Sequence, residues 1–102
     1  MRYYFLKYIN WADAPHPLMA DPIKEIDITK YMPVWTDLVD ETKPIEEVLE
    51  ALFYKFNMDH PEHYAAPSMS VMDVVQFVDT KINVYYICCS VGWKEVRLKG
   101  ND

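Results

Sequence analysis

Hydrophobic residues recur with the period of an α-helix between positions 45 and 56. They stand at i, i+3, i+4, i+7, i+8 and i+11, on one helical face: Ile45, Val48, Leu49, Leu52, Phe53 and Phe56. Thr42 is suited to cap the first turn, because its hydroxyl can accept from a free amide. Asn57 can adopt the left-handed conformation that often follows a last turn. The pattern predicts an amphipathic helix over Pro44–Asn57.

Three strands are predicted after this helix, from runs rich in β-branched and aromatic residues. The runs cover Ser70–Val78, Ile82–Cys89 and Trp93–Leu98, and the first contains no glycine or proline. Asp79–Lys81 is typical of a tight turn, and Gly92 marks a turn or bulge before the third run. Together these segments predict an antiparallel meander in the C-terminal part.

The segment before the helix contains two further strands and one long loop. Arg2–Ile9 carries bulky residues at both alternating sets of positions, so we expect a strand inside the sheet. Asn10–Pro22, which contains three prolines, is expected to be a loop. The alternation in Glu25–Ile28 suggests a short strand, and Val34–Val39 is predicted as an edge strand, because Pro33 is tolerated only at an edge or a bulge.

These elements predict an α+β fold, an antiparallel sheet of four to five strands with one main amphipathic helix packed on one face. The 102 residues are expected to form a single domain, residues 1–102, since 51% of them are hydrophobic and can fill a core. No apolar run is long enough to cross a bilayer and no secretory leader is recognisable. The expected location is therefore the cytoplasm.

The net negative charge of the chain argues against some classes of binding partner. Its formal net charge is −6, from 16 Asp and Glu against 10 Lys and Arg. A nucleic-acid surface of the usual kind needs a basic patch that replaces phosphate counterions. Direct binding of nucleic acid is therefore not expected, whereas a protein that mimics nucleic acid by presenting carboxylates stays open.

No motif predicts a catalytic centre or a cofactor. The two glycines cannot form a phosphate-binding loop, and no serine lies in a nucleophile elbow. His60 and His63, with Asp59 or Glu62, are the candidate metal ligands, but Pro61 between them makes the geometry awkward and a third strong ligand is missing. We expect no enzyme, no cofactor and no metal, and interpret this stretch as a polar corner in which Asp59 caps a short turn.

Cys88 and Cys89 are adjacent in a predicted strand, where neighbouring side chains point to opposite faces. An unstrained bond between them is not expected. Our interpretation is one buried and one partly exposed thiol, with a vicinal redox switch as the alternative.

Three residues are candidates for contact with a partner: Trp11, Asp73 and Trp93. Asp73 stands within a predicted strand, where aspartate is disfavoured and a buried charge needs a partner. It is expected to accept hydrogen bonds from the corner Ser68–Ser70, or alternatively to lie on a partner-facing edge. Trp11, in the proline-rich loop, is the tryptophan that we most expect to be exposed, and exposed tryptophans mark binding surfaces.

Two segments of the chain, LEALFYKFNMDHPEHYAAPSMSVMDVVQF and YYICCSVGWKEV, together resemble the YodL-like domain. This domain recurs in proteins of bacterial conjugative elements and phages, often inside large polyvalent proteins. The resemblance implies an accessory or interaction domain of a mobile element and not an enzyme. The residues that match its pattern are Phe56, Asn57, Pro61, Glu62, Tyr64, Ser68, Ser70, Val71, Asp73, Val74, Val75, Tyr85, Tyr86, Ser90, Gly92, Trp93 and Val96.

Residues and resemblance lead to two main hypotheses of function. The first is a non-catalytic protein-interaction domain of a bacterial mobile genetic element, which binds a host or element protein through aromatic and acidic residues. The second is an acidic inhibitor that occupies the nucleic-acid site of a host defence or regulatory protein. A metal- or redox-dependent enzyme built on Asp59–His63 or on Cys88–Cys89 is a third, weaker option. The partner is a protein of unknown identity.

Overall fold

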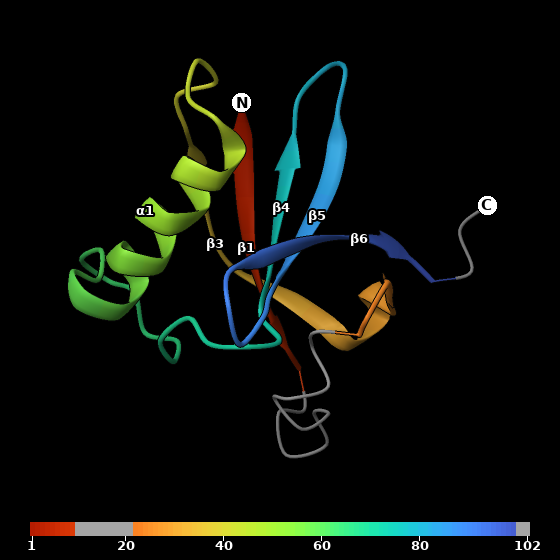
Figure 1. Ribbon diagram of the computed structural model, residues 1–102. Coiled ribbons are helices and arrows are strands. Elements are labelled where there is room, and N and C mark those ends of the chain that lie inside the picture. Colours follow the sequence, from red (N-terminus) through yellow and green to blue (C-terminus); the bar gives the residue numbers. More distant parts are fainter. Residues whose placement is uncertain (10–21, 100–102) are drawn as a thin grey trace.

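The structure, a computed structural model, describes residues 1–9 and 22–99 and contains one α-helix and six strands (Figure 1). The predicted loop Asn10–Pro22, with Trp11, lies almost wholly outside the described residues. The elements in chain order are β1 (Arg2–Tyr8), β2 (Glu25–Ile26), a 3₁₀ turn (Ile28–Lys30), β3 (Tyr31–Leu38), α1 (Ile45–Met58), β4 (Val74–Val78), β5 (Asn83–Cys88) and β6 (Trp93–Leu98).

The strands form one sheet in the order β2-β6-β5-β4-β1-β3, and α1 lies along one of its faces (Figure 1). Neighbouring strands are antiparallel, except that β2 runs parallel to β6. The predicted α+β class is confirmed. The sheet has one strand more than the largest expected number, since the two residues of β2 pair with Arg97 and Leu98.

β1 lies between β3 and β4, as its bulk on both faces predicted. β3 is an edge strand, as predicted, but begins earlier, at Tyr31. It continues through Pro33 because the register shifts there: Phe5 opposes Trp35, and Leu6 opposes Pro33. The extra residue makes a β-bulge, which together with the edge position tolerates a proline.

Most outward-facing amides of β3 are used within the chain. Hydrogen-bonded and non-hydrogen-bonded residue pairs alternate along antiparallel strands. The Val39 amide donates to the Met1 carbonyl, so the neighbouring pair, Arg2 with Leu38, is a non-hydrogen-bonded one. The Leu38 amide therefore points away from β1, and it donates to Asp37 Oδ1 at 2.8 Å. The Tyr31 amide donates to the Ile28 carbonyl.

Alternation along the strands divides the buried side chains into two cores. The core between α1 and the sheet, here called the helix-side core, contains Tyr3, Phe5, Val48, Leu49, Leu52, Phe56, Met69, Val75 and Phe77. The second core lies on the other face and contains Leu6, Ile26, Tyr31, Met72, Val74, Tyr85, Ile87, Cys89 and Val96. Both faces of the central strands are therefore buried.

α1 differs from its prediction in its caps and at one apolar position. The Thr42 hydroxyl donates to Asp40 Oδ1 and does not cap the helix; the N-cap is Pro44, without a side-chain hydrogen bond. Asn57 stays helical, and its side-chain amide donates to the Phe53 carbonyl at 2.7 Å. Phe53 itself is 37% exposed, because it stands at the margin of the apolar face.

β4 starts four residues later than predicted, at Val74. The chain turns just before it, since the Asp73 amide donates to the Ser70 carbonyl at 3.0 Å, and Met72 takes a left-handed φ of 81°. Asp73 therefore precedes the strand and is not part of it. In the part of the chain that the structure describes, no helix has the length and apolar character needed to span a membrane.

Candidate functional site

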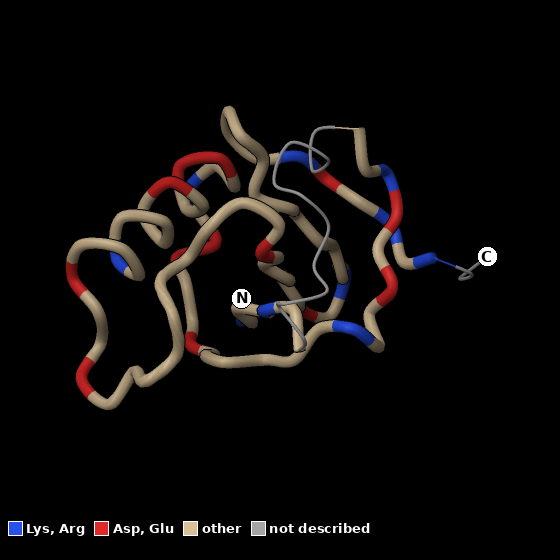
Figure 2. Tube along the Cα trace, turned by 90° about the horizontal axis from the view of Figure 1, so that it is seen from below, with Lys and Arg blue, Asp and Glu red and all other residues tan. Residues whose placement is uncertain are grey.

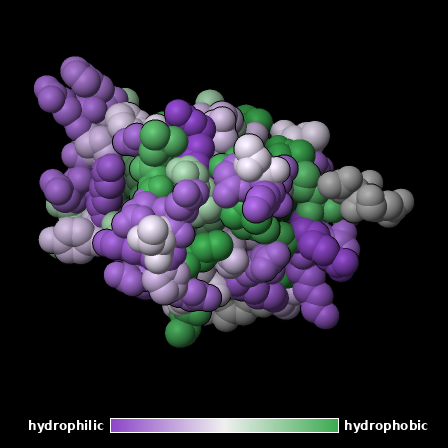
Figure 3. Space-filling model, turned by 90° about the horizontal axis from the view of Figure 1, so that it is seen from above, coloured by the Kyte–Doolittle hydropathy of each residue, from purple (hydrophilic) through white to green (hydrophobic). Residues whose placement is uncertain are grey.

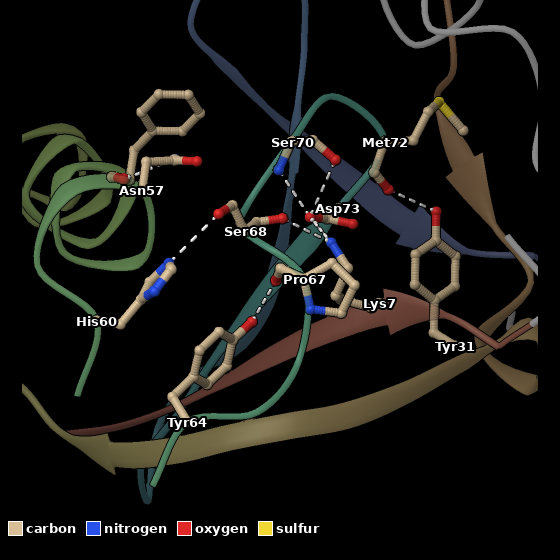
Figure 4. A network of polar contacts seen from close by, with 11 residues as sticks. Lys7, Tyr31, Asn57, His60, Tyr64, Pro67, Ser68, Ser70, Met72 and Asp73 are labelled. Carbon is tan, nitrogen blue, oxygen red and sulfur yellow. Dashed lines mark hydrogen bonds and ion pairs between the residues drawn. The ribbon is translucent and has the colours of Figure 1, made fainter. Parts of the chain in front are cut away.

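Asp73 is the only buried charged residue in the described part of the chain, with 4% of its surface exposed. Its Oδ2 lies 2.5 Å from Lys7 Nζ and accepts from the Ser70 amide at 2.8 Å (Figure 4). The expected bonds from the corner to Asp73 are thus present. The carboxylate is engaged within the chain and is not presented at a sheet edge.

Lys7, on β1, forms an ion pair with Asp73 and so connects the segment before β4 to the sheet. Its ammonium group also donates to the Ser68 carbonyl at 2.9 Å, and only 12% of its side chain is exposed. The irregular segment 59–73, here called the corner, is therefore tied to β1 by one cation (Figure 4). Because both charges are withdrawn from water, each depends on the other for stabilisation.

Burial raises the pKa of Asp73 above its ordinary value, although Lys7 and Ser70 act in the opposite direction. The loss of hydration disfavours the charged carboxylate more than the partners favour it. Burial raises the pKa of the Tyr31 hydroxyl, and the fields of Tyr8 and of the Asp73 carboxylate add to this effect. The Tyr31 hydroxyl donates to the Met72 carbonyl at 2.9 Å.

Aromatic packing fixes the other end of the corner. The Tyr64 ring stacks on Phe5, with 6.1 Å between centroids, and lies 5.0 Å from Phe56 and 5.8 Å from Trp35. Its hydroxyl donates to the Pro67 carbonyl at 2.6 Å, and burial raises its pKa to about 12. Tyr64 thereby connects the corner to the helix-side core.

The two candidate metal-ligating histidines have different neighbours. His60 Nε2 lies 3.3 Å from Ser68 Oγ, while His63 is exposed, with its Nε2 3.9 Å from Glu62 Oε1. Residues 1–9 and 22–99 contain no group of three or more His, Cys, Asp or Glu side chains that could hold a metal ion.

Both cysteines are buried thiols, so the expectation of one partly exposed thiol is wrong. Cys88, the last residue of β5, is 3% exposed, and Cys89, which follows it and packs in the second core, is 8% exposed. Burial raises the pKa of the Cys88 thiol to about 12. A thiol that stays protonated is a poor nucleophile.

α1 presents apolar side chains to the outside as well as to the core. Tyr54 is 62% exposed and Met58 73%, and they lie one turn apart beside the partly exposed Phe53. We call these residues, with the exposed Glu46, Glu47 and Glu50 of the first turns, the α1 outer face. Of the seven large hydrophobic residues that are exposed in the described chain, three lie here.

Acidic residues concentrate around this helix. Residues 31–65 contain eight of the 16 acidic residues and two of the 10 basic ones, which accounts for the full net charge of −6. Figure 2 shows the positions of acidic residues, in red, along α1 and its flanking loops. In the view of Figure 3, hydrophobic patches reach the surface between hydrophilic side chains.

The predicted partner-binding residues do not form one exposed patch. Trp93 is half-buried against the helix-side core and Asp73 is buried, although both adjoin Cys88: Trp93 opposes it in β6, and the Asp73 carbonyl accepts from its amide. Lys7 and the α1 outer face were not predicted from the sequence. Lys7 and Asp73 were each the lone charge in the apolar middle of a predicted strand, a signal that could have paired them.

A sequence model described as the YodL-like domain matches residues 6–98 of the chain. No curated protein and no solved structure shows significant similarity to it.

Proposed function

The chain belongs to the YodL-like domain family, and from that membership we propose that it is a non-catalytic protein-interaction domain of a bacterial mobile genetic element. It binds a host or element protein in the cytoplasm. The observation that carries the proposal is the α1 outer face, where Phe53, Tyr54 and Met58 are exposed on the same helix as three exposed glutamates. The resemblance to domains of conjugative elements and phages supports the mobile-element setting.

The chemistry of the α1 outer face suits protein recognition. Tyrosine and methionine bring large contact areas, and tyrosine loses little conformational entropy on binding. Neighbouring exposed apolar side chains on a helix are characteristic of docking sites. Glu46, Glu47 and Glu50 lie at the other end of the same helix and favour a partner with a basic margin, because complementary charge accelerates association.

The residues predicted from the sequence have separate roles in this proposal. Trp11 remains a candidate contact. Trp93 supports the helix-side core against which α1 packs. Asp73 acts as a positioning residue, since its contacts with Lys7 and Ser70 hold the corner that follows α1.

The proposal can be tested by capture of partners from a bacterial lysate with tagged protein. We expect the complex with the partner to persist at high salt, because apolar contacts are not screened by ions. The double variant Tyr54→Ala/Met58→Ala should lose that partner and keep the wild-type circular dichroism spectrum. Val91→Ala is the matched control, since Val91 is 90% exposed but lies in the β5–β6 turn. Equal capture by the double variant and the wild type would refute the role of this face.

A second candidate function is favoured by the charge distribution. All of the net charge of −6 resides in residues 31–65, and clustered carboxylates can imitate the phosphates of nucleic acid. In this alternative the domain inhibits a nucleic-acid-binding protein of the host. The captured partner would then dissociate at high salt, and Glu46→Gln/Glu47→Gln/Glu50→Gln would release it, whereas Tyr54→Ala/Met58→Ala would retain it.

A further inference from the structure

β5 and β6 separate before either strand ends. They pair from Cys88 opposite Trp93 to Tyr85 opposite Val96. Beyond that pair β6 turns away (Figure 1), and its last two residues, Arg97 and Leu98, pair with β2 instead. The sheet therefore has a fork between β5 and β6.

The alternation of hydrogen-bonded pairs between β5 and β6 shows which backbone groups have no partner strand in the fork. The Cys89 amide donates to the Gly92 carbonyl, so the hydrogen-bonded pairs of this ladder alternate from there and include Tyr85 with Val96. The next such pair would be Asn83 with Leu98, but in the described chain the pairing stops before it. The Arg97 amide donates to Lys24 on the opposite edge, which agrees with Leu98 facing the fork.

A cleft of about 260 Å³ occupies the fork, lined by residues of both strands. Tyr85, Val96 and Leu98 supply apolar surface. Asn83 adds a side-chain amide, whose Oδ1 accepts from Gln76 at 2.8 Å, and Gln76 also donates to the Tyr85 hydroxyl at 3.0 Å. These hydrogen bonds hold the Asn83 and Tyr85 side chains in place in the absence of a ligand.

We propose that this cleft binds a short extended peptide segment as an inserted strand. The main chain of such a segment carries donors and acceptors on both edges, so it can pair with Asn83 on one side and Leu98 on the other. Glu95 and Arg97 line the cleft with opposite charges, which favours a neutral segment over an ion. Recognition by strand addition is a common mode of peptide binding. The site is independent of the α1 outer face.

The test is a titration of ¹⁵N-labelled protein with pools of acetylated, amidated tripeptides of randomised sequence, followed by NMR. We expect at least one pool to shift the Asn83 and Leu98 amide resonances saturably, while those of α1 stay in place. The same pool with N-methylated peptide bonds should bind at least about tenfold more weakly, because it lacks the donor. If no pool shifts both resonances, or the N-methylated pool binds equally, the proposal is wrong.

Two proline variants provide a matched pair. Leu98→Pro removes the amide that faces the cleft and should abolish peptide binding with the α1 resonances unchanged. Lys99→Pro removes the neighbouring amide, which donates to the Ile26 carbonyl on the opposite edge, and should retain binding. Wild-type affinity of a folded Leu98→Pro protein would overturn the inserted-strand geometry.

Discussion

The helix-side core and the corner meet at Met69, a corner residue that is buried in this core, but the remaining contacts that hold the two regions differ in kind. In the core, Leu49, Phe56 and Phe77 are fully buried and contact other apolar side chains. The corner is irregular from residue 59 to 73 and is fixed by the Lys7–Asp73 ion pair and by Tyr64. Apolar burial is additive and non-directional, whereas the ion pair acts only in one geometry.

This difference teaches that the two regions should respond to different perturbations. Loss of apolar volume should weaken the core at any pH. The corner should respond to changes of charge, because Lys7 has no other carboxylate among its hydrogen-bond or ion-pair partners in the described residues. The corner is therefore where a buried charge makes stability depend on protonation.

The largest effect is expected from Phe56→Ala. Phe56 is 0% exposed, and its ring centroid lies 4.8 Å from that of Phe5, so the substitution should lower the free energy of unfolding by about 3–5 kcal/mol. Chemical denaturation measures this value. Phe53→Ala on the same helix is the control and should lower it by less than about 1 kcal/mol. Equal losses would contradict the assignment of the two helix faces.

The next effect tests the ion pair. Lys7→Met should lower the free energy of unfolding by about 3 kcal/mol at neutral pH, since it leaves a buried carboxylate without its cation. The double variant Lys7→Met/Asp73→Asn should be more stable than Lys7→Met, because the uncompensated charge is gone. A double-mutant cycle with purely additive effects would show that the two residues are not coupled.

A smaller effect is expected on the pH dependence of stability. The raised pKa of Asp73 means that the native state binds its proton more tightly than the unfolded chain. The stabilising contribution is then complete below the unfolded pKa, about 3.9, and is lost as pH rises through the folded pKa. The stability of the wild type relative to Asp73→Asn should therefore fall as pH rises from about 4.

Exposed aspartates titrate in the opposite direction, which makes the comparison with Asp73→Asn necessary. The pKa values of Asp27, Asp40 and Asp79 are lowered by hydrogen bonds to nearby residues. Their contribution is lost as pH falls, in both the wild type and the variant, and so cancels in the difference. A difference that grows with pH would mean that Lys7 outweighs burial at Asp73.

The smallest effect is expected from Tyr64→Phe. The substitution keeps the aromatic ring but removes the hydrogen bond to the Pro67 carbonyl, so the free energy of unfolding should fall by about 1 kcal/mol. Tyr54→Phe is the control, because Tyr54 is 62% exposed, and its stability should be unchanged. A similar loss in both variants would mean that removal of a tyrosine hydroxyl, and not of the bond to Pro67, accounts for the effect.

Periodicity predicted the elements whose structure depends on their own pattern. α1, β5 and β6 were predicted to within one or two residues, and β1 was correctly placed inside the sheet. The start of β4 was not, because Val71 and Met72 look like strand residues in isolation. Their turn depends on Asp73 contacts with Ser70 and with Lys7, which is distant in sequence.

The candidate site was predicted only in part. The bond from the corner to Asp73 followed from the donors at positions 68–70. The pairing with Lys7 did not, because the lone charges at positions 7 and 73 do not by themselves show that the two segments are neighbours in the fold. The exposure of Phe53 and Tyr54 also depends on the orientation in which α1 packs against the sheet. A 3.6-residue period defines the centre of an apolar face better than its margins.

The edge at β3 has a consequence for how this domain behaves at high concentration. Pro33 has no amide, and the Leu38 and Tyr31 amides are occupied by Asp37 and by Ile28. A neighbouring molecule that approaches this edge finds few free amide donors along the eight residues of β3. The edge is therefore protected against pairing with a strand of another molecule. We therefore expect that copies of the domain, when crowded or joined in tandem, do not polymerise through β3.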